Sequence, residues 1–141
     1  KETILKDHTL EAVMSMPDDL FHPVGVVPCV MVFTAHQPHN KNEYHKTWFG
    51  YWKNDGFVKT KHLGRVNIEG NWVKIRDMWL DSYFSKREEA GLSVLKKVTG
   101  NDEWCAEAYL ETDYSNLTAH DFERELKNFM LFKLLNGDSH D

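Results

Sequence analysis

Three histidines and a glutamate lie close together in this sequence and are the first groups that could do chemistry. His36, His39 and His45 fall in the polar stretch 36–46, with Glu43 among them. Imidazole and carboxylate groups are common ligands of zinc. The spacing His-x2-His-x5-His matches no known zinc pattern, however, and the sequence shows nothing that would support four ligands in a polar loop. We expect titratable surface histidines here, and a metal hydrolase remains a hypothesis that bound metal would support.

A row of glutamates near the end of the chain is the second candidate. Glu103, Glu107 and Glu111 are spaced at i, i+4 and i+8. Acid–base catalysis by a carboxylate pair needs two different environments, which split the two pKa values. A regular row offers no such asymmetry, so we expect an exposed acidic stripe that is suited to an interface.

Basic residues gather beside aromatic residues in the middle of the chain. Cations on a hairpin next to aromatic rings can hold a nucleic-acid backbone, so they are candidate DNA contacts. A solvated hairpin tip, with its tryptophan turned to the core, fits the same pattern. The basic residues are Lys53, Lys59, Lys61, His62 and Arg65, around Trp52 and Phe57.

The distribution of charge is uneven along the chain. The net charge is −5, yet residues 41–65 carry six basic and two acidic groups, and residues 100–141 carry three basic and ten acidic groups. The middle can therefore contact phosphate, whereas the tail would repel it and is better suited to protein or solvent. With 141 residues, 41% of them hydrophobic, the chain suffices for one modest globular domain.

Nothing in the sequence indicates secretion or membrane insertion. No apolar run reaches the ~18 residues that span a bilayer, and the start of the chain has no apolar signal segment. Cys29 and Cys105 lie in apolar settings and are expected to be buried, reduced thiols. These features predict a cytoplasmic protein without a membrane partner.

Hydrophobic patterning predicts the elements that position these groups. Residues 9–16 form an imperfectly alternating strand that Pro17 ends, and the apolar run 29–34 is typical of a strand buried on both faces. Residues 47–52 and 57–61 flank an Asp-Gly pair, which predicts a hairpin because glycine accepts positive φ in the turn.

Two helices and a short strand are expected further on. Helical spacing predicts a helix over 71–85, and residues 92–98 favour a short strand. Residues 118–121 resemble a capping box for a last helix, which Gly137 ends. The apolar residues that repeat at helical spacing in the first helix are Trp72, Ile75, Trp79 and Tyr83.

The stretch HTLEAVMSMPDDLFHPVGVVPCVMVFTAH, residues 8–36, resembles the modification subunits of type I restriction–modification systems. The phrases DGFVKTK (55–61) and DEWCAEAYLETDY (102–114) are similar to the same group of N6-adenine DNA methylases, so the resemblance covers most of the chain. The resemblance implies an α/β fold: residues 1–40 would be the edge of a Rossmann-like methyltransferase sheet, with an antiparallel hairpin of strands 9–16 and 29–35. Residues 41–141 would be an α+β extension that docks DNA or a partner subunit.

The family's cofactor and catalytic motifs do not occur here. The sequence has no Gly-x-Gly turn for S-adenosylmethionine and no Asn-Pro-Pro-aromatic motif for the target amine, and it begins with Lys1 rather than Met. We therefore expect a C-terminal piece that is inactive alone. The full-length enzyme would transfer methyl from S-adenosylmethionine to adenine N6, with DNA and the specificity and restriction subunits of a type I complex as partners.

One family element does have a matching residue. In the family, the loop between the hairpin strands carries an aromatic residue that packs on the flipped-out adenine, and Phe21 in the stretch DDLFHP stands at that position. An extruded base regains ~1–3 kcal/mol by stacking on an aromatic face. An alternative role for Phe21 is to anchor the loop or the core. A separate alternative for the whole chain is a stand-alone binding module.

Overall fold

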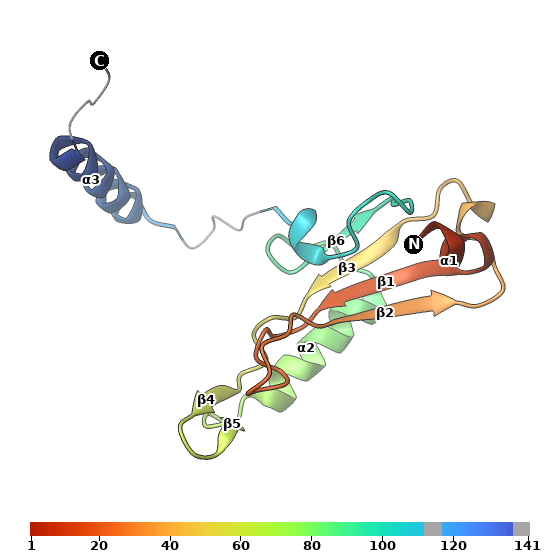
Figure 1. Cartoon of the computed structure of the whole chain (residues 1–141), viewed down its shortest axis with the longest axis horizontal. Helices are drawn as coiled ribbons and strands as arrows, with labels where there is room; N and C mark the ends of the chain where they lie inside the picture. Colours follow the sequence, from red (N-terminus) through yellow and green to blue (C-terminus); the bar gives the residue numbers. More distant parts are fainter. Residues whose placement is uncertain (112–116, 137–141) are drawn as a thin grey trace. The chain divides into compact units, whose positions relative to one another are not determined.

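A computed structural model describes residues 1–111 and 117–136, in two compact units, Lys1–Glu111 and Thr112–Asp141. The first unit is an α/β structure built on a mixed four-stranded sheet in the order β2-β1-β3-β6 (Figure 1). The strands of this sheet are β1 (Thr9–Ser15), β2 (Cys29–Thr34), β3 (Thr47–Tyr51) and β6 (Ser93–Lys96).

The expected hairpin is present. The short helix α1 (Glu2–Asp7) leads directly into β1, and β1 pairs with β2 in antiparallel register, from Thr9↔Thr34 to Ser15↔Cys29. On its other side β1 pairs in parallel with β3, which in turn pairs antiparallel with β6. The strands of the extension thus continue the sheet of the hairpin. The placement of this sheet at the edge of a Rossmann-like domain, and the boundary at residue 40, stay predictions.

The core lies on both faces of the sheet, because β1 and β3 are its two inner strands. One cluster packs against the helix α2 (Trp72–Ser85), and the other packs against α1 and the short 3-10 helix η2 (Ala106–Ala108). A bulge in β1 between Leu10 and Ala12 shifts the alternation, so that Leu10 and Val13 point to the same cluster. The buried members on the α2 side are Ala12, Met14, Trp48, Trp52 and Trp79.

The expectation that residues 29–34 are buried on both faces is wrong. β2 lies at the edge of the four-stranded sheet, and its first three residues are exposed. Cys29 is therefore exposed rather than buried, and Cys105 is only half-buried; neither is in a disulfide. An apolar strand resembles a central strand in sequence whether or not its second neighbour is present.

The hairpin expected around Asp55-Gly56 is also wrong. β3 pairs with β1 and β6, and the following segment forms a separate two-stranded sheet of β4 (Val58–Thr60) and β5 (Gly64–Val66). Gly56 does adopt a positive φ of 77°, and the Asn54 side chain accepts its N–H, so the pair makes a turn. That turn directs the chain away from β3 instead of back along it.

The helices agree with their sequence patterns. α2 covers the predicted range, and β6 confirms the predicted short strand. In the second unit, α3 (Ala119–Asn136) begins with reciprocal capping: the Asp121 N–H donates to Thr118 Oγ1 (3.3 Å), and the Thr118 N–H donates to Asp121 Oδ2 (3.0 Å). The predicted stop at Gly137 lies outside the described residues. No helix in the described part of the chain is long and apolar enough to cross a bilayer.

Candidate functional site

The loop between β1 and β2 folds into consecutive turns. At its base the Met16 N–H donates to the Pro28 carbonyl (3.0 Å). Within it, three further backbone hydrogen bonds of 2.8–3.1 Å run from Leu20 to Pro17, from His22 to Asp19 and from Val24 to Phe21. The loop therefore has a defined backbone although it projects from the sheet.

Phe21 is the exposed aromatic residue of this loop. Its surface is 57% accessible, and it belongs to neither core cluster. A ring that is neither packed in the core nor withdrawn from solvent is free to meet an incoming flat molecule. Phe21 is therefore not a core residue, and its contact with the target base stays a prediction.

The loop is fixed on one side by a network around Lys53. The Lys53 ammonium donates to the carboxylate of Asp18 in the loop and lies 3.1 Å from Glu107 Oε1. Glu107 in turn accepts a hydrogen bond of 2.5 Å from Ser15 Oγ, at the end of β1, and Ser15 Oγ accepts the Ala106 N–H (3.1 Å). Lys53 thus joins the loop, the end of β1 and η2.

On the other side the loop is held by Arg65 of β5. Arg65 Nη2 donates to both carboxylate oxygens of Asp55 (2.7 and 2.8 Å), and its Nε lies 3.0 Å from Asp19 Oδ1 in the loop. The guanidinium also lies 5.3 Å from the ring centre of Phe57. Lys59 of β4 adds a longer contact of 3.7 Å to Asp19. Figure 1 shows the β4–β5 hairpin beside this loop.

The protonation of the Lys53 network follows from these contacts. Burial alone would lower the pKa of Lys53, but its hydrogen bonds to Asp18 and Glu107 raise it above the ordinary value. Burial would raise the pKa of Glu107, but the hydrogen bond from Ser15 and the Lys53 cation hold it below its usual range. Lys53 and Glu107 therefore both stay charged at neutral pH.

Four of the five basic residues predicted to contact DNA are thus in different situations. Lys53 and Arg65 form ion pairs with carboxylates, and their side chains are only 16% and 12% exposed. Lys59 is half-exposed and makes one long contact. Lys61, in the turn after β4, is exposed and forms no ion pair with any described residue. Sequence reasoning missed the acidic partners Asp18 and Asp19, although an acidic pair in the loop and a basic set downstream were visible signals.

The predicted glutamate stripe does not form. Of the three residues only Glu107 lies in a helix, and η2 is too short to align it with the others. Glu107 binds Ser15 and Lys53, whereas Glu103 makes a weak contact with Lys1 at 3.7 Å. The three glutamates therefore do not lie along one helix, and Glu103 and Glu107 have different partners.

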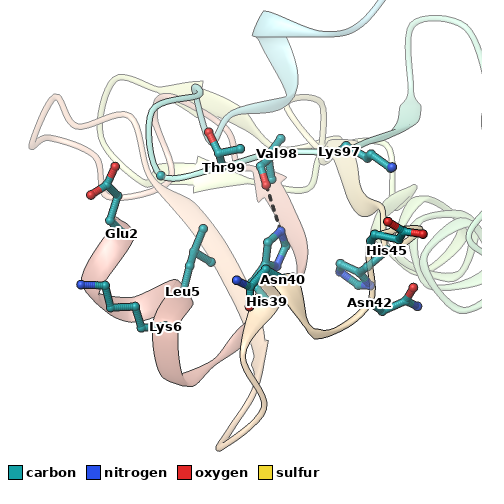
Figure 2. Close-up of a pocket in the computed structure, with 12 residues that line it drawn as sticks. Glu2, Leu5, Lys6, His39, Asn40, Asn42, His45, Lys97, Val98 and Thr99 are labelled. Carbon is teal, nitrogen blue, oxygen red and sulfur yellow. Dashed lines mark hydrogen bonds between the residues drawn. The ribbon is translucent and has the colours of Figure 1, made fainter.

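Two of the three loop histidines line a cavity of about 460 Å³ between α1, the segment 39–45 and the segment 97–100. His39 donates from Nε2 to the Val98 carbonyl (3.0 Å; Figure 2) and accepts the Leu10 N–H at Nδ1 (3.2 Å). His45 contacts the Leu10 carbonyl (3.0 Å). These two rings are half-buried and hydrogen-bond to backbone groups, so they are not the surface histidines that the sequence predicted. Among the described residues no set of three His, Cys, Asp or Glu side chains is placed to hold a metal ion.

The bracing by His39 predicts a pH-dependent stability. Burial lowers the pKa of His39 below its ordinary value of 6.5, although the hydrogen bond to the Val98 carbonyl acts in the opposite direction. A proton on Nδ1 would also face the Leu10 N–H donor. The unfolded chain binds the proton more readily, so the free energy of unfolding is full above pH 6.5 and falls as the pH drops through the lowered pKa.

Urea denaturation of the wild-type chain at about pH 7.5 and about pH 5.0, on either side of the ordinary histidine pKa of 6.5, should show this loss. His39→Gln should reduce the pH dependence, because its amide does not titrate. His62→Gln, at an exposed position, should leave it unchanged. An equal pH dependence in His39→Gln and the wild type would contradict the assignment.

The sequence of this chain is similar to known proteins. It matches the family described as N-6 DNA Methylase over residues 1–131, and the chain belongs to this family. It is similar to the "Type II restriction enzyme and methyltransferase RM.BcgI" of Heyndrickxia coagulans, with 33% identity over 135 residues. The alignment covers 94% of this chain and 20% of that relative, so the chain spans about a fifth of the relative's length.

Proposed function

We propose that this chain is part of a site-specific DNA methyltransferase of a restriction–modification system, which transfers methyl from S-adenosylmethionine to adenine N6. The observation that carries the proposal is the family match over residues 1–131. The relative, named a restriction enzyme and methyltransferase, supports the link to restriction–modification. A cytoplasmic location is part of the same proposal.

In the intact enzyme this chain contributes structure and a base-contacting loop. The outer edge of β2 has no partner strand among the described residues, and Val30 and Met31 on it are exposed. We infer that an upstream part of the parent protein completes the sheet there. Phe21 then meets the extruded adenine, while Lys59 and Lys61 are the accessible candidates for the DNA backbone, and Lys53 and Arg65 are the less accessible ones.

The proposal places the cofactor site outside this chain. Its sequence has neither the glycine-rich turn for S-adenosylmethionine nor the Asn-Pro-Pro-aromatic motif for the target amine. No residue here is therefore assigned to S-adenosylmethionine, and the chemistry belongs to the upstream part of the enzyme. The isolated chain is proposed to be inactive.

The intact protein tests the proposal. Incubated with labelled S-adenosylmethionine and unmethylated DNA, it should produce N6-methyladenine, whereas the isolated chain should neither transfer methyl nor bind the cofactor at micromolar concentration. Absence of N6-methyladenine with the intact protein would refute the function. Methyl transfer by the isolated chain would refute the division of labour.

The type I organisation is a separate part of the proposal and rests on the resemblance of residues 8–36. In that case specificity and restriction subunits should copurify with the methyltransferase, and both should be needed for restriction of unmethylated DNA. The relative's name instead joins restriction and methyltransferase in one protein. Restriction and methylation by a single polypeptide would therefore overturn the type I assignment and leave the methyltransferase intact.

A further inference from the structure

We propose that Asp18 and Asp19 form a two-point ionic anchor that positions Phe21, with Lys53 and Arg65 as the positioning residues that hold it. This inference rests on the proposed function, because it takes Phe21 as the contact to the target base. It gives the two basic residues a task other than binding DNA.

The first point of the anchor joins the loop to the end of β1. Lys53 donates to Asp18 and is itself held by Glu107, which accepts from Ser15. Ser15 also accepts the Ala106 N–H, so the network ends in fixed backbone. A lysine held by two carboxylates in this way is a defined attachment point rather than a mobile surface charge.

The second point of the anchor, formed by Arg65 and Asp19, is more buried than the first. The side chain of Asp55 is 7% exposed and accepts from Arg65 Nη2 through both oxygens, which orients the guanidinium. Arg65 Nε lies 3.0 Å from Asp19 Oδ1, an ion pair without hydrogen-bond geometry. An arginine fixed by one carboxylate has lost most of its side-chain freedom, so binding the second carboxylate costs less entropy. Asp19 is thus held by a prearranged cation.

The anchor lies directly beside Phe21 in the chain. The Asp19 carbonyl accepts the His22 N–H, so Phe21 sits inside the turn that Asp19 begins. Phe21 has no packing of its own in either core cluster, and its position is set by the loop backbone. Stacking on a base requires a ring held at a fixed place, since small displacements of a positioned group reduce the rate.

The test uses the intact methyltransferase and the variant Asp19→Asn, with Asp81→Asn as its control. Asp81 forms an exposed ion pair with Arg87 at α2, away from the loop. Hydrogen exchange of the Leu20, His22 and Val24 amides should accelerate about 5-fold or more in Asp19→Asn, and single-turnover methyl transfer should slow by about 5-fold, the order expected for a partly exposed ion pair. Asp81→Asn should change neither quantity. Unchanged loop exchange in Asp19→Asn would overturn the anchor.

A double-mutant cycle separates the anchor from the proposed function. If Asp19 acts through Phe21, Asp19→Asn should slow methyl transfer no further in a Phe21→Ala enzyme. Equal slowing in both backgrounds would overturn positioning of Phe21 by the anchor. If Phe21→Ala itself leaves methyl transfer unchanged, the base-contact role fails, and the positioning inference falls with it, whereas the exchange rates still report whether the loop is anchored.

Discussion

Trp48→Ala should lower the free energy of unfolding by about 3–5 kcal/mol. Trp48 is fully buried in β3, within the cluster between the sheet and α2, and packs edge-to-face on Trp52 and Tyr83. Its indole N–H donates to the Arg87 carbonyl (3.1 Å), just beyond the end of α2. Alanine leaves a cavity and removes one of the two donors to that carbonyl, which also accepts from Ser93 Oγ (2.6 Å). Urea denaturation followed by circular dichroism measures the loss.

Two variants separate the contributions to this loss. Trp48→Phe keeps part of the ring and should cost about 1–3 kcal/mol, for the smaller ring in a fully buried site and for the lost hydrogen bond. Gly50→Ala should also destabilise by roughly 1–3 kcal/mol through overpacking, since its Cβ would lie 2.4 Å from Cη2 of the Trp48 ring.

In the Trp48→Ala background the added methyl group of Gly50→Ala loses its two shortest contacts and keeps the 3.3 Å contact with Trp52 Nε1. Its destabilising effect should therefore largely disappear, and the two substitutions should be strongly non-additive. Additive effects, or a loss below about 1 kcal/mol for Trp48→Ala, would contradict the packing described for this cluster.

Local patterns predicted the elements whose structure is decided locally. Trp72, Ile75 and Trp79 recur at helical spacing because all three face the same cluster on the sheet. The pairing of Thr118 with Asp121 needs only four neighbouring residues, and it appears as the sequence indicates. The hairpin of β1 and β2 followed from the resemblance together with the turn residues between the strands.

Pairing between strands that are far apart in the sequence explains the two wrong predictions, the doubly buried strand and the hairpin around the Asp-Gly pair. The run 29–34 has the composition of a central strand, yet its burial depends on a second neighbour that the described residues do not contain. The predicted Asp-Gly turn is present, but β3 pairs with β1 and β6, which lie far from it in sequence. Turn chemistry fixes a bend, whereas the choice of partner strand depends on the whole sheet.

The candidate site, too, could be predicted only in part from the sequence. Phe21 was identified through the resemblance, and the structure places it exposed in a defined loop. The basic residues were predicted to contact DNA, but composition alone cannot tell whether a cation faces phosphate or a carboxylate of the same chain. Lys53 and Arg65 turned out to bind Asp18 and Asp19, because the sheet brings the loop against the β4–β5 segment.

Phe21→Ala in the intact enzyme should slow methyl transfer by about 5- to 150-fold, which corresponds to the loss of ~1–3 kcal/mol of base stacking. The exposed ring is the only part of the side chain that can supply this energy, and its removal leaves the loop's backbone hydrogen bonds and ion pairs in place. Single-turnover methylation of a duplex with one target adenine measures the effect on the affected step.

Phe21→Trp is the matched control, because another flat aromatic face can stack on the same base and should preserve most of the rate. Binding of S-adenosylmethionine should be the same in both variants, since no residue of this chain is assigned to the cofactor. The exposed position of Phe21 also predicts a nearly unchanged melting temperature for Phe21→Ala. A large fall in melting temperature with an unchanged rate per folded molecule would instead make Phe21 a packing residue. A slow Phe21→Trp enzyme with normal DNA affinity would show that the loop requires the shape of phenylalanine rather than an aromatic face as such.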